Sequence, residues 1–112
     1  MKSIYFITCF EKISGYRTDF PDMPNLGDAY TVGFVDNIEK AMQIVKNNIC
    51  DISDSCYKYA VIEQISIGIY QEVEERWFFK YDKKYNKYRQ ISEPFELTNY
   101  PQITFLYFSE KQ

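Results

Sequence analysis

The residues best suited to chemistry lie between Trp77 and Arg89, where the stretch WFFKYDKKYNKYR alternates aromatic rings with cationic groups. Residues 80–89 contain five basic side chains and one acid, a local charge of +4: Lys80, Lys83, Lys84, Lys87 and Arg89 against Asp82. Such cations can bind phosphates, and an aromatic ring can stack on a nucleobase. The stretch therefore predicts either a surface for a flat anionic ligand or a half-buried hairpin whose lysines protect its edge.

A second candidate cation is Arg17, in the loop motif SGYRTDF at 14–20. Gly15 allows the backbone to turn sharply there, and Asp19 can hold the guanidinium in place. An arginine presented in this way could form a bidentate hydrogen-bonded contact with a phosphate or a carboxylate of a ligand. It could equally pair with an internal acid such as Glu63 and pin the loop to the sheet.

Glu63 is an acid on an otherwise apolar strand face that it shares with Tyr59 and Val61. A partly buried carboxylate needs a partner, or its pKa shifts. A catalytic acid is one interpretation of this position. The other is structural: the strand reaches solvent there, or Arg17, Lys58 or a tyrosine hydroxyl satisfies the carboxylate.

The sequence lacks the groups on which most enzymes depend. It contains no histidine, the commonest general base and neutral metal ligand. Cys9, Cys50 and Cys56 form no C-x-x-C pair, so we expect small core residues rather than disulfides or a zinc site. No GxGxxG, GxxxxGK, GxSxG or HExxH motif occurs. These features favour a non-enzymatic protein without a cofactor or metal, with a small enzyme using Glu63 or Cys56 as an alternative.

The composition predicts one cytoplasmic domain spanning residues 1–112. Apolar residues make up 46% of the chain, enough to form a single packed core. The net charge of −3, from 13 basic and 16 acidic residues, provides no general attraction to extended nucleic acid. No secretion signal is evident, and no apolar run approaches the ~20 residues needed to cross a bilayer. We therefore expect neither a membrane nor a nucleic-acid partner.

The hydrophobic pattern of the first half predicts two strands and a helix. Residues 3–10 are apolar on both faces, which indicates a central strand. Glycines and prolines mark residues 11–30 as a long loop, and a short strand follows at 30–35. The helix after it has apolar residues at helical spacing, and Asp36 with Glu39 resembles a capping box.

The second half is predicted to be mainly strands. A long strand covers 57–70, the acidic run 72–76 is typical of a solvated turn, and 77–81 with 85–91 forms a hairpin. A final apolar strand is expected at 103–108. This order predicts an α+β fold: a mostly antiparallel sheet of about five strands, one covering helix and a long N-terminal loop.

The layout of SGYR, a helix ending in NNICDISDSCYKYAVIE, then GIY and a WFF strand resembles a family of small uncharacterised proteins from low-GC Gram-positive bacteria, their phages and mobile elements. The resemblance brings no active site with it. The resemblance implies a genomic context of phages and mobile elements, in which small acidic proteins often act by binding another molecule rather than by catalysis. Such proteins include inhibitors of host defence that coat a nuclease or sequester a nucleotide signal.

Together these features predict a phage anti-defence protein that sequesters a nucleotide-derived signalling molecule. In this hypothesis Arg17, Lys87 and Arg89 bind phosphates, while Trp77 or Tyr59 stacks on the base. The alternative is an anti-CRISPR-like inhibitor that uses the acidic run against a cationic groove of a host defence protein or nuclease. The high aromatic content, 19%, also predicts a homo-oligomer, by default a dimer.

Overall fold

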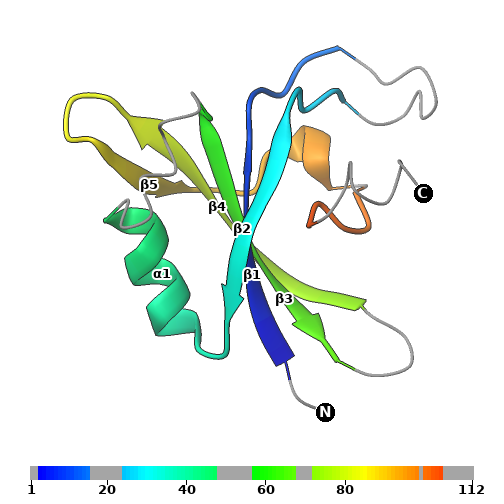
Figure 1. Cartoon of the computed structure of the whole chain (residues 1–112). Helices are drawn as coiled ribbons and strands as arrows, with labels where there is room; N and C mark the ends of the chain where they lie inside the picture. Colours follow the sequence, from blue (N-terminus) through cyan, green and yellow to red (C-terminus); the bar gives the residue numbers. More distant parts are fainter. Residues whose placement is uncertain (1–2, 16–23, 48–56, 68–71, 99, 105–112) are drawn as a thin grey trace.

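A computed structural model describes residues 3–15, 24–47, 57–67, 72–98 and 100–104. Within these residues, five antiparallel strands form one sheet in the order β2-β1-β3-β4-β5, and helix α1 covers one face (Figure 1). The elements are β1 (Ser3–Phe10), β2 (Ala29–Val35), α1 (Ile38–Lys46), β3 (Tyr59–Ser66), β4 (Glu72–Asp82), β5 (Lys87–Ile91) and the short 3-10 helix η2 (Phe95–Leu97). The predicted α+β fold of about five strands and one helix is confirmed.

The central position of β1 explains its two apolar faces. It pairs with β2 on one side and β3 on the other, and the register sets Phe6 opposite Glu63 and Ile7 opposite Ile62. Successive side chains of a strand point to opposite faces, so each face of β1 faces a different half of the core. The prediction of a central first strand is therefore confirmed.

The sheet buries a different apolar cluster on each face. The helix face packs against α1 through Ile7, Cys9, Ala41, Val45, Ala60, Ile62, Phe79 and Tyr88. The opposite face, here called the loop face, is covered by residues that follow β1 and β5: Phe10, Val61 and Phe78 pack against Leu26, Leu97, Tyr100 and Ile103. Two cores on one sheet account for much of the apolar content of this short chain.

The N-cap of α1 is Asn37, so the prediction of Asp36 as the cap is wrong. The Asn37 side-chain oxygen accepts a hydrogen bond from the Lys40 amide at 3.1 Å, which satisfies one of the free N–H groups of the first turn. Asp36 lies one residue earlier and forms an exposed ion pair with Lys40 at 3.9 Å. The helix ends at Lys46 with Asn47 as its C-cap.

The hairpin of β4 and β5 is confirmed, but β4 begins earlier than expected. The acidic run 72–76 forms the first half of β4 rather than a turn, because all of its residues except Glu74, where the register shifts, pair with β3. At the hairpin tip, Asp82 Oδ1 accepts from the Lys84 amide at 3.0 Å. Asn86 has a left-handed φ of 53°, and its side-chain oxygen accepts from the Tyr81 hydroxyl. These contacts give the tip a defined shape.

The other strand predictions differ mainly in their ends. Of the strand expected at 57–70, β3 covers Tyr59–Ser66, residues 57, 58 and 67 are not in a strand, and 68–70 lie outside the described residues. Of the strand expected at 103–108, Ile103 and Thr104 are not in a strand, and 105–108 lie outside the described residues. The amides of Ile103 and Thr104 bind a side chain instead, as described below.

Candidate anion-binding site

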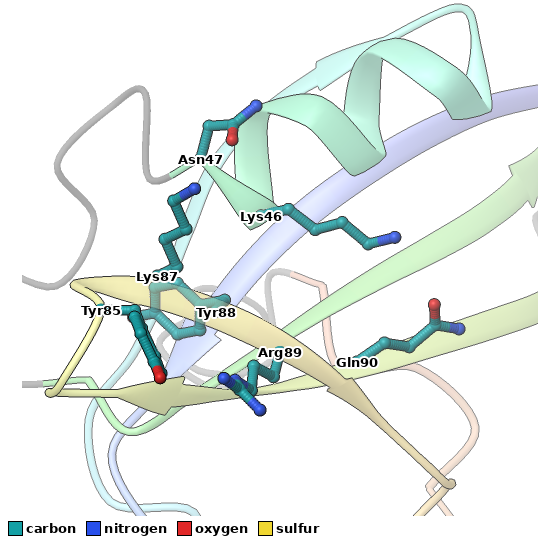
Figure 2. Close-up of a pocket in the computed structure, with 7 residues that line it drawn as sticks. All are labelled: Lys46, Asn47, Tyr85, Lys87, Tyr88, Arg89 and Gln90. Atoms are coloured by element: carbon teal, nitrogen blue, oxygen red, sulfur yellow. The ribbon is translucent and has the colours of Figure 1, made fainter.

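A groove of about 650 Å³ lies where the C-terminal end of α1 meets β5. It is lined by Lys46, Asn47, Tyr85, Lys87, Tyr88, Arg89 and Gln90 (Figure 2). β5 is an edge strand of the described sheet, so one side of it is available to form a wall of this groove. In Figure 2 the Lys87 side chain extends toward Asn47 and the end of α1, whereas Tyr85 and Arg89 lie on the other side of the β5 ribbon.

The lining of the groove is cationic. Lys46, Lys87 and Arg89 carry positive charge, and none of the seven described lining residues is an acid. Within the described part of the chain, Arg89 is paired with Asp82, whereas no ion pair involves Lys46 or Lys87. The C-terminus of a helix contributes only about half a negative charge. The two lysines therefore leave the groove with a net attraction for anions.

The Arg89 guanidinium is held from two directions. Its Nε lies 2.8 Å from Asp82 Oδ2 in an ion pair, and its central carbon lies 5.0 Å from the centroid of the Tyr85 ring. Lys84 Nζ lies 5.4 Å from the same centroid. The contact with Asp82 is through Nε, and the two terminal nitrogens of a guanidinium can form a bidentate contact with a phosphate.

The structure brings together only part of the predicted ligand site. Lys87 and Arg89 both line the groove, and Lys80 lies opposite Arg89 in the β4–β5 register, as expected. Tyr59 lies on the loop face, where it is opposite Lys80, which is in turn opposite Arg89. Tyr59 is therefore two strands away from Arg89, a separation of roughly 10 Å between their backbones. Arg17 falls outside the described residues.

Neither of the two rings predicted to stack on a base lines the groove. Tyr59 is stacked on Phe10, with ring centroids 5.2 Å apart and planes 9° apart, and Lys80 Nζ lies 5.9 Å from its ring. Trp77 packs on the helix face beside Tyr5, at 6.1 Å between centroids. The two candidate rings thus lie on opposite faces of the sheet, and each already has ring partners within the fold.

The sequence alone did not indicate Lys46, Asn47 and Gln90 as site residues. Lys46 and Asn47 have the pattern of an ordinary helix C-terminus, where a cation offsets the partial negative charge. Their proximity to Lys87 results from the packing of α1 against β5. No local pattern encodes that packing.

Glu63 is fully buried on the loop face, and its carboxylate is saturated with donors. It accepts from Arg76 Nε at 2.8 Å, the Ile103 amide at 2.8 Å, the Thr104 amide at 2.5 Å and the Thr104 hydroxyl. The predicted alternatives of solvent contact, Lys58 or a tyrosine hydroxyl are therefore wrong. The partner is Arg76, which follows from the β3–β4 register that sets the two residues opposite each other.

The other groups considered for chemistry offer no further site. Cys9 is buried, which confirms its expected core position, while Cys50 and Cys56 lie outside the described residues. In the described ranges, no group of three or more Cys, Asp or Glu side chains is arranged to hold a metal ion. None of the helices in the described part of the chain has the length and apolarity to cross a membrane.

Comparison with known proteins returned no match to any protein-family model, curated protein or solved structure. The resemblance to small phage and Gram-positive proteins therefore stays a prediction, and the groove beside β5 is the feature from which function can be argued.

Proposed function

We propose that this chain is a non-enzymatic binding protein whose groove between α1 and β5 binds the phosphates of a nucleotide-derived small molecule. The observation that carries the proposal is that Lys46, Lys87 and Arg89 line one groove and that none of its described lining residues is an acid. An overall acidic chain gains such a local positive site only by clustering its cations.

Size and charge both favour a small ligand over a polymer. Small-molecule sites typically have volumes of roughly 300–1,000 Å³, and this groove falls within that range. With Arg89 paired to Asp82, the two lysines supply the uncompensated charge, which matches a ligand with about two negative charges. A nucleic-acid backbone would need a longer row of cations.

In the cell, a binder without catalysis would act by lowering the free concentration of its ligand. We propose sequestration of a nucleotide signal in phage anti-defence as that role, in line with the family resemblance. A homo-oligomer is part of the proposal, because Phe34 and Phe95 are 62% and 86% exposed and such surface favours association.

An inhibitor that binds a defence protein or nuclease is the second candidate. It is favoured by the acids Glu72, Glu74 and Glu75, which are exposed along the first half of β4. This candidate predicts a stoichiometric complex with a cationic partner that weakens as salt is raised. Pull-down from host lysate at low and high salt distinguishes it from small-molecule sequestration.

Calorimetric titration with ADP, ADP-ribose and cyclic di- and trinucleotides tests the leading proposal. At least one compound should bind and raise the thermal midpoint, because a ligand of the native state stabilises it. Lys87→Gln should weaken that binding by about tenfold, the loss of one charge-assisted contact. Lys83→Gln is the matched control, since Lys83 carries the same charge on the hairpin tip but does not line the groove.

Two results would count against the proposal. One is the absence of heat and of any midpoint change across the whole panel. The other is an equal loss of affinity in Lys87→Gln and Lys83→Gln, because that would indicate diffuse attraction to the hairpin rather than a site.

A further inference from the structure

A second hollow, of about 470 Å³, continues from the groove along the side of α1. It is lined by Ile38, Glu39, Met42, Gln43, Lys46 and Asn47. Lys46 and Asn47 line both hollows, so the two meet at the C-terminal end of the helix. The surface available to one ligand is therefore longer than the β5 groove alone.

The chemistry of this surface changes along its length. At the β5 end are the cations Lys87 and Arg89. Among the described residues of the α1 end, Lys46 at the junction is the one cation. This end also has the partly buried apolar side chains of Ile38 and Met42 and the exposed amide of Gln43. A nucleobase is bound by this kind of surface, in which apolar side chains contact the face of the ring and an amide can hydrogen-bond to its edge.

The acid Glu39 fixes the direction in which a ligand would lie. Glu39 and Lys46 are seven residues apart on α1, which is about 10 Å along the helix axis. A phosphate near Glu39 would be repelled, whereas a phosphate near Lys46 and Lys87 would be attracted. A base at the Glu39 end meets no such repulsion, and its amino groups can donate to a carboxylate.

We propose that the ligand is a nucleotide that spans both hollows, an inference that rests on the proposed function. Its phosphates bind Lys46 and Lys87, and its base lies on Ile38 and Met42 with the Gln43 amide at its edge. The base site is thus on α1 rather than on Trp77 or Tyr59, whose rings are packed within the fold. The class of ligand is a nucleobase joined to at least two negative charges.

The test compares ADP with inorganic pyrophosphate, which carries the charge without the base. ADP should bind at least about tenfold more tightly, since contact with a base contributes to affinity and pyrophosphate lacks it. Gln43→Ala should weaken ADP binding about fivefold, as expected for one hydrogen bond, and leave pyrophosphate binding unchanged. Lys87→Gln should weaken both ligands.

Lys40→Gln is the control on the same helix, because Lys40 is exposed and lines neither hollow. If ADP and pyrophosphate bind equally, or if Gln43→Ala weakens both alike, the base site on α1 is overturned while the anion groove stands. If neither compound binds and the nucleotide panel above also gives no heat, the proposed function fails and this inference fails with it.

Discussion

Two arginine–carboxylate pairs in this protein have the same contact and opposite surroundings. In both, an arginine Nε lies 2.8 Å from a carboxylate oxygen. The side chains of Arg76 and Glu63 are 9% and 0% exposed, whereas those of Arg89 and Asp82 are 64% and 26% exposed. The Arg76–Glu63 pair is buried beside the amides of Ile103 and Thr104, which also donate to Glu63, whereas the Arg89–Asp82 pair borders the groove. Accessibility, rather than pairing itself, therefore separates a structural ion pair from a group that can bind a ligand.

The largest effect is expected from Glu63→Gln. An amide in this position cannot accept from all the donors now held by the carboxylate, and Arg76 would be left as an uncompensated buried charge. Losing one partner of a buried pair costs about 3–5 kcal/mol, a large part of the roughly 5–15 kcal/mol stability of a typical domain. Urea unfolding measures the loss. Glu75→Gln, an exposed acid on the neighbouring strand β4, is the control, and a loss below about 1 kcal/mol in Glu63→Gln would contradict the structural role.

A smaller effect is expected for a buried hydroxyl in the hairpin. Burial raises the pKa of Tyr88 above its ordinary value of 10.0, with smaller contributions from Cys9 and Tyr81, and its hydroxyl donates to the Tyr57 carbonyl at 2.9 Å. Tyr88→Phe should cost about 1 kcal/mol near neutral pH, where the protein loses one neutral hydrogen bond.

The same residue predicts a loss of stability in alkali. Above about pH 10 the unfolded Tyr88 ionises while the folded one stays protonated, so its stabilising contribution decreases as the pH rises, by up to about 1.4 kcal/mol per pH unit. Unfolding near neutral pH and at about pH 10.5 should show a weaker pH dependence in Tyr88→Phe than in the wild type. Tyr85→Phe, at the exposed tip, provides the comparison, and an unchanged pH dependence in Tyr88→Phe would disprove the assignment.

The smallest effect on stability is expected from Asp82→Asn. The pair with Arg89 is open to solvent, and exposed ion pairs contribute about 0–1 kcal/mol. The loss should shrink further as salt is added, whereas the loss in Glu63→Gln should change little with salt. Urea unfolding curves of Asp82→Asn and Glu63→Gln at low and high ionic strength measure both salt dependences. A loss above about 2 kcal/mol in Asp82→Asn would show that the two pairs do not differ as described.

Much of the fold could be predicted because the strands have clear periodic patterns. The two apolar faces of β1 indicated its central position, and the break at the hairpin tip indicated β4 and β5. The N-cap was missed because Asp36 and Asn37 are both good caps in sequence, and only the backbone shows which one precedes the first turn. The extent of β4 was missed because charge was taken as a sign of a turn, although an exposed strand face carries charge equally well.

The candidate site could be predicted only in part. Lys87 and Arg89 were found from the excess of basic residues at 80–89, although their side chains lie on different sides of the β5 ribbon in Figure 2. Lys46 and the α1 hollow depend on how the helix packs across the sheet. The Arg76 partner of Glu63 depends on the strand register, and its Ile103 and Thr104 partners are about 40 residues away in the chain.

The attachment of Ile103 and Thr104 to Glu63 affects the order in which the chain can mature. During synthesis, β3 and β4 can pair before residue 104 has left the ribosome, but until then the Glu63 carboxylate lacks three of its four donors. The loop face is also incomplete at that stage, because Ile103 and Tyr100 supply part of its apolar cover. Final consolidation of this half of the core therefore follows translation of the C-terminal region, and a nascent chain halted earlier would expose an unfinished apolar surface to chaperones.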